Sequence, residues 1–252
     1  GLTIMTFPGV PSEMYRMWQD TAVPFLKSQG WGQETIYSEM MRFRGIGESA
    51  LAEKVAHLFD SQNPTVAPYA GKGEVRLRVA AKASSQKEAA AMIQPITTEI
   101  KQIAGLDYFG SDEETLSAVV GKLLTNAQQT LSVAESCTGG GLGAMLTEIP
   151  GSSSYFWGGV IAYANQVKQA LLHVNGQDLA EYGAVSDIVA QQMALGVKQR
   201  LQTDWGISIT GIAGPSGDTP DKPVGLVYIG IATPENESFS YDYRFGTQRG
   251  RE

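Results

Sequence analysis

The residues best suited to do chemistry in this sequence are a run of serines followed by a tyrosine and a lysine. The run is Ser152, Ser153 and Ser154, and Tyr163 and Lys168 come shortly after it. A serine hydroxyl is a poor nucleophile until a base takes its proton, and a lysine can be that base when burial lowers its pKa. A helix cap, a tyrosine at the edge of the core and a solvated lysine would explain the same residues. Their spacing therefore leaves both interpretations open.

A glycine-rich turn offers a second kind of chemistry. The stretch from Ala134 to Gly141 leads from an apolar segment into small residues. A strand that enters a helix through such a turn presents backbone N–H groups beside the positive end of the helix dipole, which suits a phosphate or an oxyanion. A tight turn that needs glycines only for packing is the alternative. Two further clusters occupy predicted strand ends, at 209–215 and 245–249, and Arg249 in the second could bind phosphate through its forked guanidinium.

Strands and helices must alternate to position these clusters. Short apolar segments bounded by turn residues predict strands, and longer segments with a helical period predict helices. The predicted strands are 131–134, 156–164, 206–210, 224–232 and 239–245, and the predicted helices include 140–147, 166–172 and 186–203. This order predicts an α/β domain with helices packed on a mixed sheet.

The first part of the chain reads as a smaller α+β unit. Its pattern predicts a helix over 14–26 that Pro24 interrupts, strands at 35–43 and 74–79, a helix around Leu51–Phe59, and a helix that Ser84 or Ser85 caps and that runs to about Ile103. Residues 108–111 are expected to be the junction to the second unit.

Composition narrows the class of protein. Of 252 residues, 42% are hydrophobic and 18% charged, as in ordinary globular proteins. A net charge of −7 gives no bulk electrostatic reason to bind nucleic acid. The single Cys137 and the two histidines predict neither an internal disulfide nor a metal site. This cysteine usage fits a cytoplasmic location best. No apolar run reaches the roughly 20 residues of a membrane span, so no membrane contact is expected.

Taken together and in order, these motifs resemble the C-terminal domain of the CinA family, which contains nicotinamide mononucleotide deamidases. The resemblance is carried by Ala134–Gly140, Pro150–Ser153, Tyr163 with Asn165 and Lys168, Gly183–Ser186, Thr210–Pro215 and Lys222–Gly225. It implies an amidohydrolase that converts nicotinamide mononucleotide to nicotinate mononucleotide and ammonia with no metal or cofactor.

The resemblance also implies a role for each site residue. Ser153 would be the nucleophile, Lys168 its general base, and Tyr163 would lie between them. Arg249 would bind the substrate phosphate. The other substrate contacts would come from Ser136, Thr138, Gly139, Gly140, Asn165, Thr210 and Gly211. The choice between Ser153 and Ser136 as nucleophile stays open at this point.

The N-terminal half resembles the later part of the two-domain CinA N-terminal half, through Pro8–Glu13, Gly45–Ser49 and Asn63–Ala67. The resemblance implies the tail of a truncated molybdopterin-binding-like domain over 1–30, a small KH-like domain over 31–108 and the deamidase domain over 109–252. It also implies a homodimer and a last helix that continues past Glu252.

Four other functions fit the sequence less well than a deamidase. A nicotinamide-dependent oxidoreductase fits poorly, because Tyr163 and Lys168 are separated by four residues rather than three and the glycine-rich loop precedes the serine by only 15 residues. A non-catalytic nucleotide-binding protein of the same family is the main alternative. ADP-ribose hydrolysis would belong to the family's first domain, most of which is expected to be missing here. RNA binding is disfavoured, because neither Gly45–Gly47 nor Ala70–Gly73 matches the Gly-x-x-Gly loop of KH domains.

Overall fold

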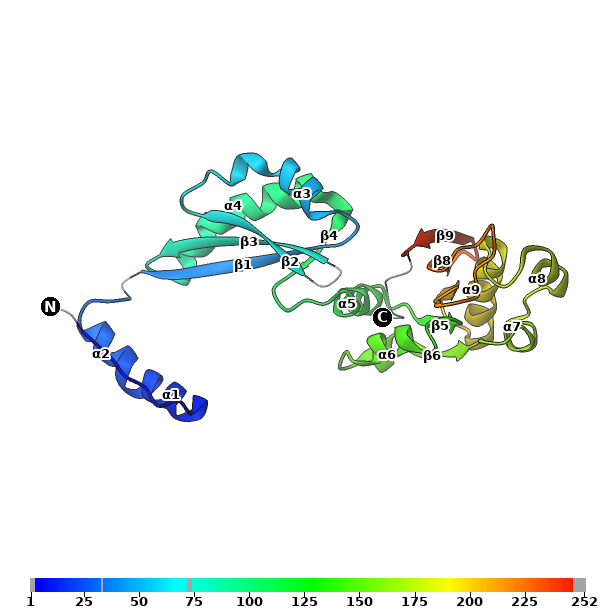
Figure 1. The fold of residues 1–252 in the computed structure, drawn as a ribbon, viewed down its shortest axis with the longest axis horizontal. Helices are drawn as coiled ribbons and strands as arrows, with labels where there is room; N and C mark the ends of the chain where they lie inside the picture. Colours follow the sequence, from blue (N-terminus) through cyan, green and yellow to red (C-terminus); the bar gives the residue numbers. More distant parts are fainter. Residues whose placement is uncertain (1–2, 33, 72–73, 247–252) are drawn as a thin grey trace. The chain divides into compact units, whose positions relative to one another are not determined.

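A computed structural model describes residues 3–32, 34–71 and 74–246, and the chain separates into two compact units, Gly1–Glu114 and Thr115–Glu252 (Figure 1). The mixed α/β class expected from the sequence is confirmed. Residues 108–111, expected as a junction, instead form a strand of the first unit. The division of the chain into three segments at 30/31 and 108/109 stays a prediction. No described helix is both long and apolar enough to cross a bilayer.

The first unit begins with a run of helical segments, α1 (Pro11–Met17), the π-helical η1 (Trp18–Ala22) and α2 (Val23–Ser28). Pro24 was expected to break this helix. It is accommodated because it lies in the first turn of α2, directly after the π-helical turn, where a missing N–H is tolerated. Ala22 is the only buried residue of these three elements.

Four antiparallel strands then form a sheet in the order β2-β3-β1-β4. The strands are β1 (Thr35–Phe43), β2 (Thr65–Gly71), β3 (Glu74–Ala83) and β4 (Tyr108–Ser111). The helices α3 (Glu48–Lys54) and α4 (Gln86–Ala104) cover one face, with short 3-10 turns η2 (Ala56–Leu58) and η3 (Gly105–Asp107) beside them (Figure 1). Ser85 caps α4 by accepting the N–H of Glu88. Alternate residues of β1 and β3, such as Met41 and Leu77, are fully buried against these helices.

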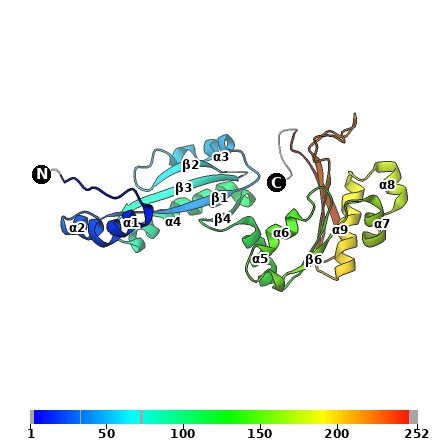
Figure 2. The same ribbon diagram turned by 60° about the horizontal axis from the view of Figure 1, so that its bottom comes forward.

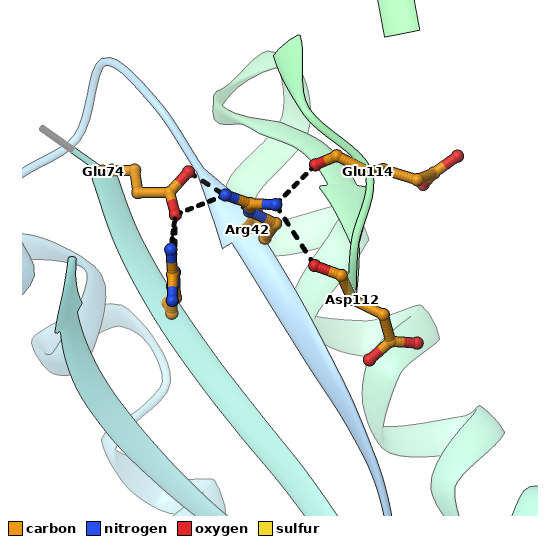
Figure 3. Close-up of polar contacts among 5 residues, drawn as sticks. Arg42, Glu74, Asp112 and Glu114 are labelled. Atoms are coloured by element: carbon orange, nitrogen blue, oxygen red, sulfur yellow. Dashed lines mark hydrogen bonds and ion pairs between the residues drawn. The ribbon is translucent and has the colours of Figure 1, made fainter. Parts of the chain in front are cut away.

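A polar cluster ties the last residues of this unit to its sheet (Figure 3). The Arg42 guanidinium donates to both carboxylate oxygens of Glu74, at 3.2 and 2.7 Å, and to the carbonyl oxygens of Asp112 and Glu114, at 3.2 and 2.8 Å. Burial raises the pKa of Glu74, but the hydrogen bonds and charges of Arg42 and Arg76 outweigh it and hold that pKa below its usual value. Arg42 therefore fixes the segment after β4 with a charged pair that is itself largely shielded from water.

The second unit is a five-stranded mixed sheet in the order β6-β5-β7-β8-β9. β5 (Leu131–Glu135), β6 (Phe156–Ile161) and β7 (Trp205–Gly211) are parallel, whereas β8 (Leu226–Ala232) and β9 (Ser238–Arg244) extend it in antiparallel fashion. The expected strands are therefore confirmed, within a few residues at their ends.

Helices cover both faces of this sheet (Figure 2). α7 (Asn165–Leu172), α8 (Gly176–Tyr182) and α9 (Asp187–Leu201) pack on one face, and α5 (Leu116–Ala127) and α6 (Gly141–Thr147) pack on the other. The 3-10 turn η4 (Ser152–Ser154) precedes β6. Gly206 and Gly230 allow the close approach of α9, because a Cβ at either position would collide with a carbonyl oxygen of that helix. In a parallel sheet the carboxyl ends of the strands share one edge, so the loops that leave β5, β6 and β7 meet there.

Candidate active site

A pocket of about 280 Å³ lies at the carboxyl ends of the parallel strands β5, β6 and β7. The loops after β5, β6 and β7 line it, together with the turn between α8 and α9. The lining residues are Ser136, Cys137, Tyr163, Lys168, Ala184, Val185, Thr210–Gly214, Ser216 and Gly217. The volume is near the lower end of the range for small-molecule sites.

Lys168 is the central ionisable residue of the pocket. It lies in the first half of α7, and only 1% of its surface is exposed. Its Nζ is 3.1 Å from Ser136 Oγ, 2.7 Å from the carbonyl oxygen of Ala162 and 3.1 Å from that of Tyr163. Burial lowers the pKa of Lys168, while the neighbouring Cys137 acts in the opposite direction. None of the hydrogen-bond partners of Nζ is a carboxylate, so the usual stabiliser of a buried ammonium ion is missing from this set.

Ser136 comes directly after β5 and is 8% exposed. Its backbone N–H donates to the carbonyl oxygen of Ile209 in β7 at 2.9 Å, which extends the parallel ladder by one residue and fixes the position of the hydroxyl. Although Ser136 and Lys168 are 32 residues apart, β5 and β6 are adjacent, and this brings their side chains together.

The glycine-rich turn after β5 was expected to bind a phosphate or an oxyanion. The carboxylate of Glu135, the last residue of β5, fills this position instead. The carboxylate of Glu135 is 1% exposed and accepts the N–H groups of Gly140, Leu142 and Gly143 at 3.0, 3.1 and 2.8 Å. The N–H groups of Gly139 and Gly141 donate to carbonyl oxygens within the turn. An anion supplied by the chain itself thus takes the place expected for a bound one. Gly139 and Gly140, expected to contact substrate, do not line the pocket.

Thr210 and Gly211 form the part of the pocket wall at the end of β7. Thr210 is 1% exposed and donates its hydroxyl to the carbonyl oxygen of Ala184 at 2.8 Å, which joins β7 to the α8–α9 turn. Gly211 lets β8 approach, since a Cβ there would lie 2.8 Å from the carbonyl oxygen of Leu226. Thr138, expected to contact substrate, is not among the lining residues, and its buried hydroxyl has no hydrogen-bond partner among the described residues.

Ser153 does not join this group. It is exposed in η4, at the amino end of β6, whereas the pocket lies at the carboxyl end of that strand. β6 has six residues, so the two ends are about 20 Å apart. The fold-back of residues 150–155 that would bring Ser153 to Lys168 within one chain is not formed, because this segment makes a 3-10 turn instead.

The other predicted residues are distributed as follows. Tyr163 lines the pocket, but its side chain is 64% exposed, and its carbonyl oxygen is the group that contacts Lys168. Asn165 is exposed at the first position of α7 and is not among the lining residues. Arg249 lies outside the described residues.

Sequence reasoning missed the part that Glu135 plays. The signal was present, because an acidic residue that ends an apolar segment just before a glycine-rich helix start is placed to accept the helix's first N–H groups. It also did not recognise Val185 or the loop at 216–217 as pocket walls.

Comparison with known proteins finds matches for both units of the chain. Residues 113–251 match the CinA C-terminal domain, and residues 38–110 match the damage-inducible protein CinA KH domain. CinA-like proteins of Gloeothece citriformis and Microcystis aeruginosa are 67% and 68% identical, over 100% and 99% of this chain. The chain spans about 60% of the length of these curated relatives.

Solved structures align with about half of the chain. The competence/damage inducible protein CihA of Agrobacterium tumefaciens is 38% identical with a TM-score of 0.52, covering 54% of this chain and 82% of that one. A CinA superfamily protein of Escherichia coli is 32% identical with a TM-score of 0.50, covering 52% and 76% respectively. The CinA C-terminal domain match, which covers more than half of the chain, and the likeness to the solved Agrobacterium tumefaciens protein show that this chain belongs to the CinA family.

Proposed function

We propose that the second unit hydrolyses a carboxamide, and that its substrate is nicotinamide mononucleotide, which becomes nicotinate mononucleotide and ammonia. The observation that carries the proposal is the buried contact between Lys168 Nζ and Ser136 Oγ at the base of the pocket. The similarity to the CinA family, which contains such deamidases, supports the choice of substrate.

The hydrogen bonds of Lys168 suit a general base. A neutral amine has two N–H donors and one lone pair. The carbonyl oxygens of Ala162 and Tyr163 can accept both donors, which leaves the lone pair directed at the Ser136 hydroxyl. Burial favours this neutral form, because it lowers the pKa of Lys168. We therefore assign the nucleophile to Ser136 and the base to Lys168.

The reaction then proceeds in two halves. Ser136 Oγ bonds to the carboxamide carbon as its proton passes to Lys168 Nζ. The C–N bond breaks as Lys168 returns that proton to the leaving nitrogen, so ammonia departs and an acyl-serine remains. Water attacks the acyl carbon and gives a proton to Lys168, which passes it to the departing Ser136 oxygen. The balance is one carboxamide and one water in, one carboxylate and one ammonium out.

Ser153 can take part in the reaction only if a second copy of the chain brings it to the pocket. We also propose the homodimer expected from the resemblance. The test below distinguishes Ser136 from Ser153 as the nucleophile. As the substrate is a metabolite of the cell interior, we place the activity in the cytoplasm.

The test is ammonia release from nicotinamide mononucleotide by the chain and its variants. We expect Ser136→Ala and Lys168→Met each to lower kcat by about a thousandfold or more, and the double variant to be little worse, because members of one catalytic unit are not additive. Ser153→Ala should stay within about threefold of the parent. If Ser153→Ala is inactive and Ser136→Ala is active, the nucleophile is Ser153 and the site is shared between copies. If the parent releases no ammonia, the deamidase proposal fails.

A further inference from the structure

The pocket has one wall made by a long loop without regular structure. This loop, residues 212–225, connects β7 to β8 and contributes Ile212, Ala213, Gly214, Ser216 and Gly217 to the lining. The turn between α8 and α9 supplies Ala184 and Val185 to the same pocket. The distance between these two segments therefore sets the width of the pocket.

One side chain joins the two segments. Lys222 lies in the loop, and its Nζ donates to the carbonyl oxygen of Val185 at 2.7 Å and to that of Tyr182. The backbone of Lys222 is itself held in place by two hydrogen bonds. Its N–H donates to the carbonyl oxygen of Thr219 at 3.1 Å, and the N–H of Thr219 donates to the carbonyl oxygen of Lys222 at 2.9 Å. Lys222 is not itself among the residues that line the pocket.

The turn that receives Lys222 has a backbone conformation suited to it. Gly183 adopts φ 72° and ψ 166°, a region that is essentially restricted to glycine. A Cβ on Gly183 would lie 3.3 Å from Lys222 Nζ. The glycine thus leaves room for the ammonium group between the two carbonyl oxygens that it contacts.

We propose that Lys222 is a positioning residue that holds the 212–225 loop against the 182–186 turn and so keeps the substrate pocket at its working width. It acts through Val185 and the loop, not on the reacting atoms. The kinetic part of the proposal rests on the proposed deamidase function, whereas the attachment of the loop does not.

The first test is hydrogen exchange, which needs no substrate. The N–H groups of Thr219, Lys222 and Gly225 are hydrogen-bonded within the loop and report on its order. In Lys222→Met we expect these amides to exchange about tenfold faster or more, because the two carbonyl oxygens lose their donor and the loop detaches. Lys222→Arg should keep exchange near the parent value, since a guanidinium can donate to two carbonyl oxygens.

Lys198 provides a matched control in the same unit. Like Lys222, it donates to two carbonyl oxygens, those of Thr233 at 2.7 Å and Pro234 at 3.3 Å, and it also donates to Asn236 Oδ1 at 2.6 Å, all in the turn between β8 and β9. Lys198→Met should lower the melting temperature and leave exchange at Thr219 and Lys222 unchanged. Gly183→Ala should reproduce the effect of Lys222→Met from the other side of the contact.

The second test is kinetic. Lys222→Met should raise KM for nicotinamide mononucleotide about tenfold with kcat within about threefold, and Lys222→Arg should restore KM. The pH dependence of kcat should be unchanged, because Lys168 keeps its partners. Unchanged loop exchange in Lys222→Met, or a loss confined to kcat, would overturn the proposal. If the parent chain lacks deamidase activity, the exchange experiment still decides whether Lys222 holds the loop.

Discussion

At the scale of single residues, the chain uses buried lysines for different purposes. Lys168 and Lys198 are both almost fully buried and both donate to carbonyl oxygens. The difference lies in the remaining partner: Lys168 contacts the hydroxyl of Ser136, whereas Lys198 contacts the amide oxygen of Asn236. An amide oxygen can only accept, so it favours a lysine that donates. A hydroxyl can give up its proton, and only Lys168 is therefore suited to act as a base.

This contrast leads to a prediction about pH. Since burial lowers the pKa of Lys168 below its ordinary value of 10.5, kcat/KM should rise about tenfold per pH unit at acid pH and level off before pH 10.5. The pKa of the lysine can also be measured by NMR titration of its amine in Ser136→Ala, which keeps the burial but should be inactive. A kcat/KM that does not change with pH, or a titration at or above 10.5, would count against Lys168 as the base.

The same shift has a consequence for stability. Between the folded-state pKa of Lys168 and 10.5, the unfolded chain binds a proton that the folded chain does not, so the free energy of unfolding rises with pH in that window. Below the folded-state pKa both states carry the proton, and the full cost of burying the ammonium weakens the fold. Lys168→Met should lack this pH-dependent increment, which denaturant unfolding of both proteins at several pH values would show.

At the scale of elements, the carboxylate of Glu135 accepts three backbone N–H groups from the turn between β5 and α6 and from the start of that helix. Glu135→Gln keeps the shape of the side chain but replaces an acceptor oxygen by a donor NH₂ that faces backbone N–H groups. We expect a loss of about 1–3 kcal/mol in the free energy of unfolding, together with lower kcat because Ser136 leaves its position. The control is Glu148→Gln, in an exposed residue at the C-terminal end of α6, which should change neither. Equal stability of the two variants would mean that Glu135 does not hold the turn.

The elements of this unit could largely be predicted from the sequence, but the pairing of site residues could not. β5 and β7 are apolar segments between turn residues, so both the strands and the position of the site at their ends followed from the pattern. The family resemblance implied Ser153 as partner of Lys168, with Ser136 left open, yet β6 separates Ser153 from Lys168 by its whole length. Ser136 is more distant in sequence and becomes the partner through the parallel pairing of β5 with β6, which no local pattern reports.

Three elements were missed for local reasons. β2 has Pro68 near its middle, a residue that argues against a strand and that is tolerated here because β2 lies at the edge of its sheet. β4 has four residues and only Gly110 is buried, so it carries no alternating pattern. α8 buries only Leu179, and its polar composition reads as a loop. β4 is stabilised by its pairing with the distant β1, and α8 by its packing against α9.

At the scale of the whole molecule, the apolar cores divide as the two units do. The buried cluster of the first unit extends from Met41 to Ala104, whereas the buried clusters of the second contain no residue before Leu124. Every described residue that lines the candidate pocket belongs to the second unit. A unit with its own core and its own site is expected to fold and to act alone.

The last prediction follows from this division. A fragment of residues 113–252 keeps Thr115, which caps α5 by accepting the N–H of Ala118, and it keeps the entire pocket. We expect this fragment to unfold in one cooperative transition and to deamidate nicotinamide mononucleotide with kcat/KM within about twofold of the 252-residue chain. Residues 1–114 should unfold separately, and in that fragment Arg42→Met should lower stability, because the carboxylate of Glu74 and the carbonyl oxygens of Asp112 and Glu114 lose a shared donor. A 113–252 fragment that is folded but more than tenfold less active would mean that the first unit contributes to the site, and that the chemistry of the chain is not confined to the second unit.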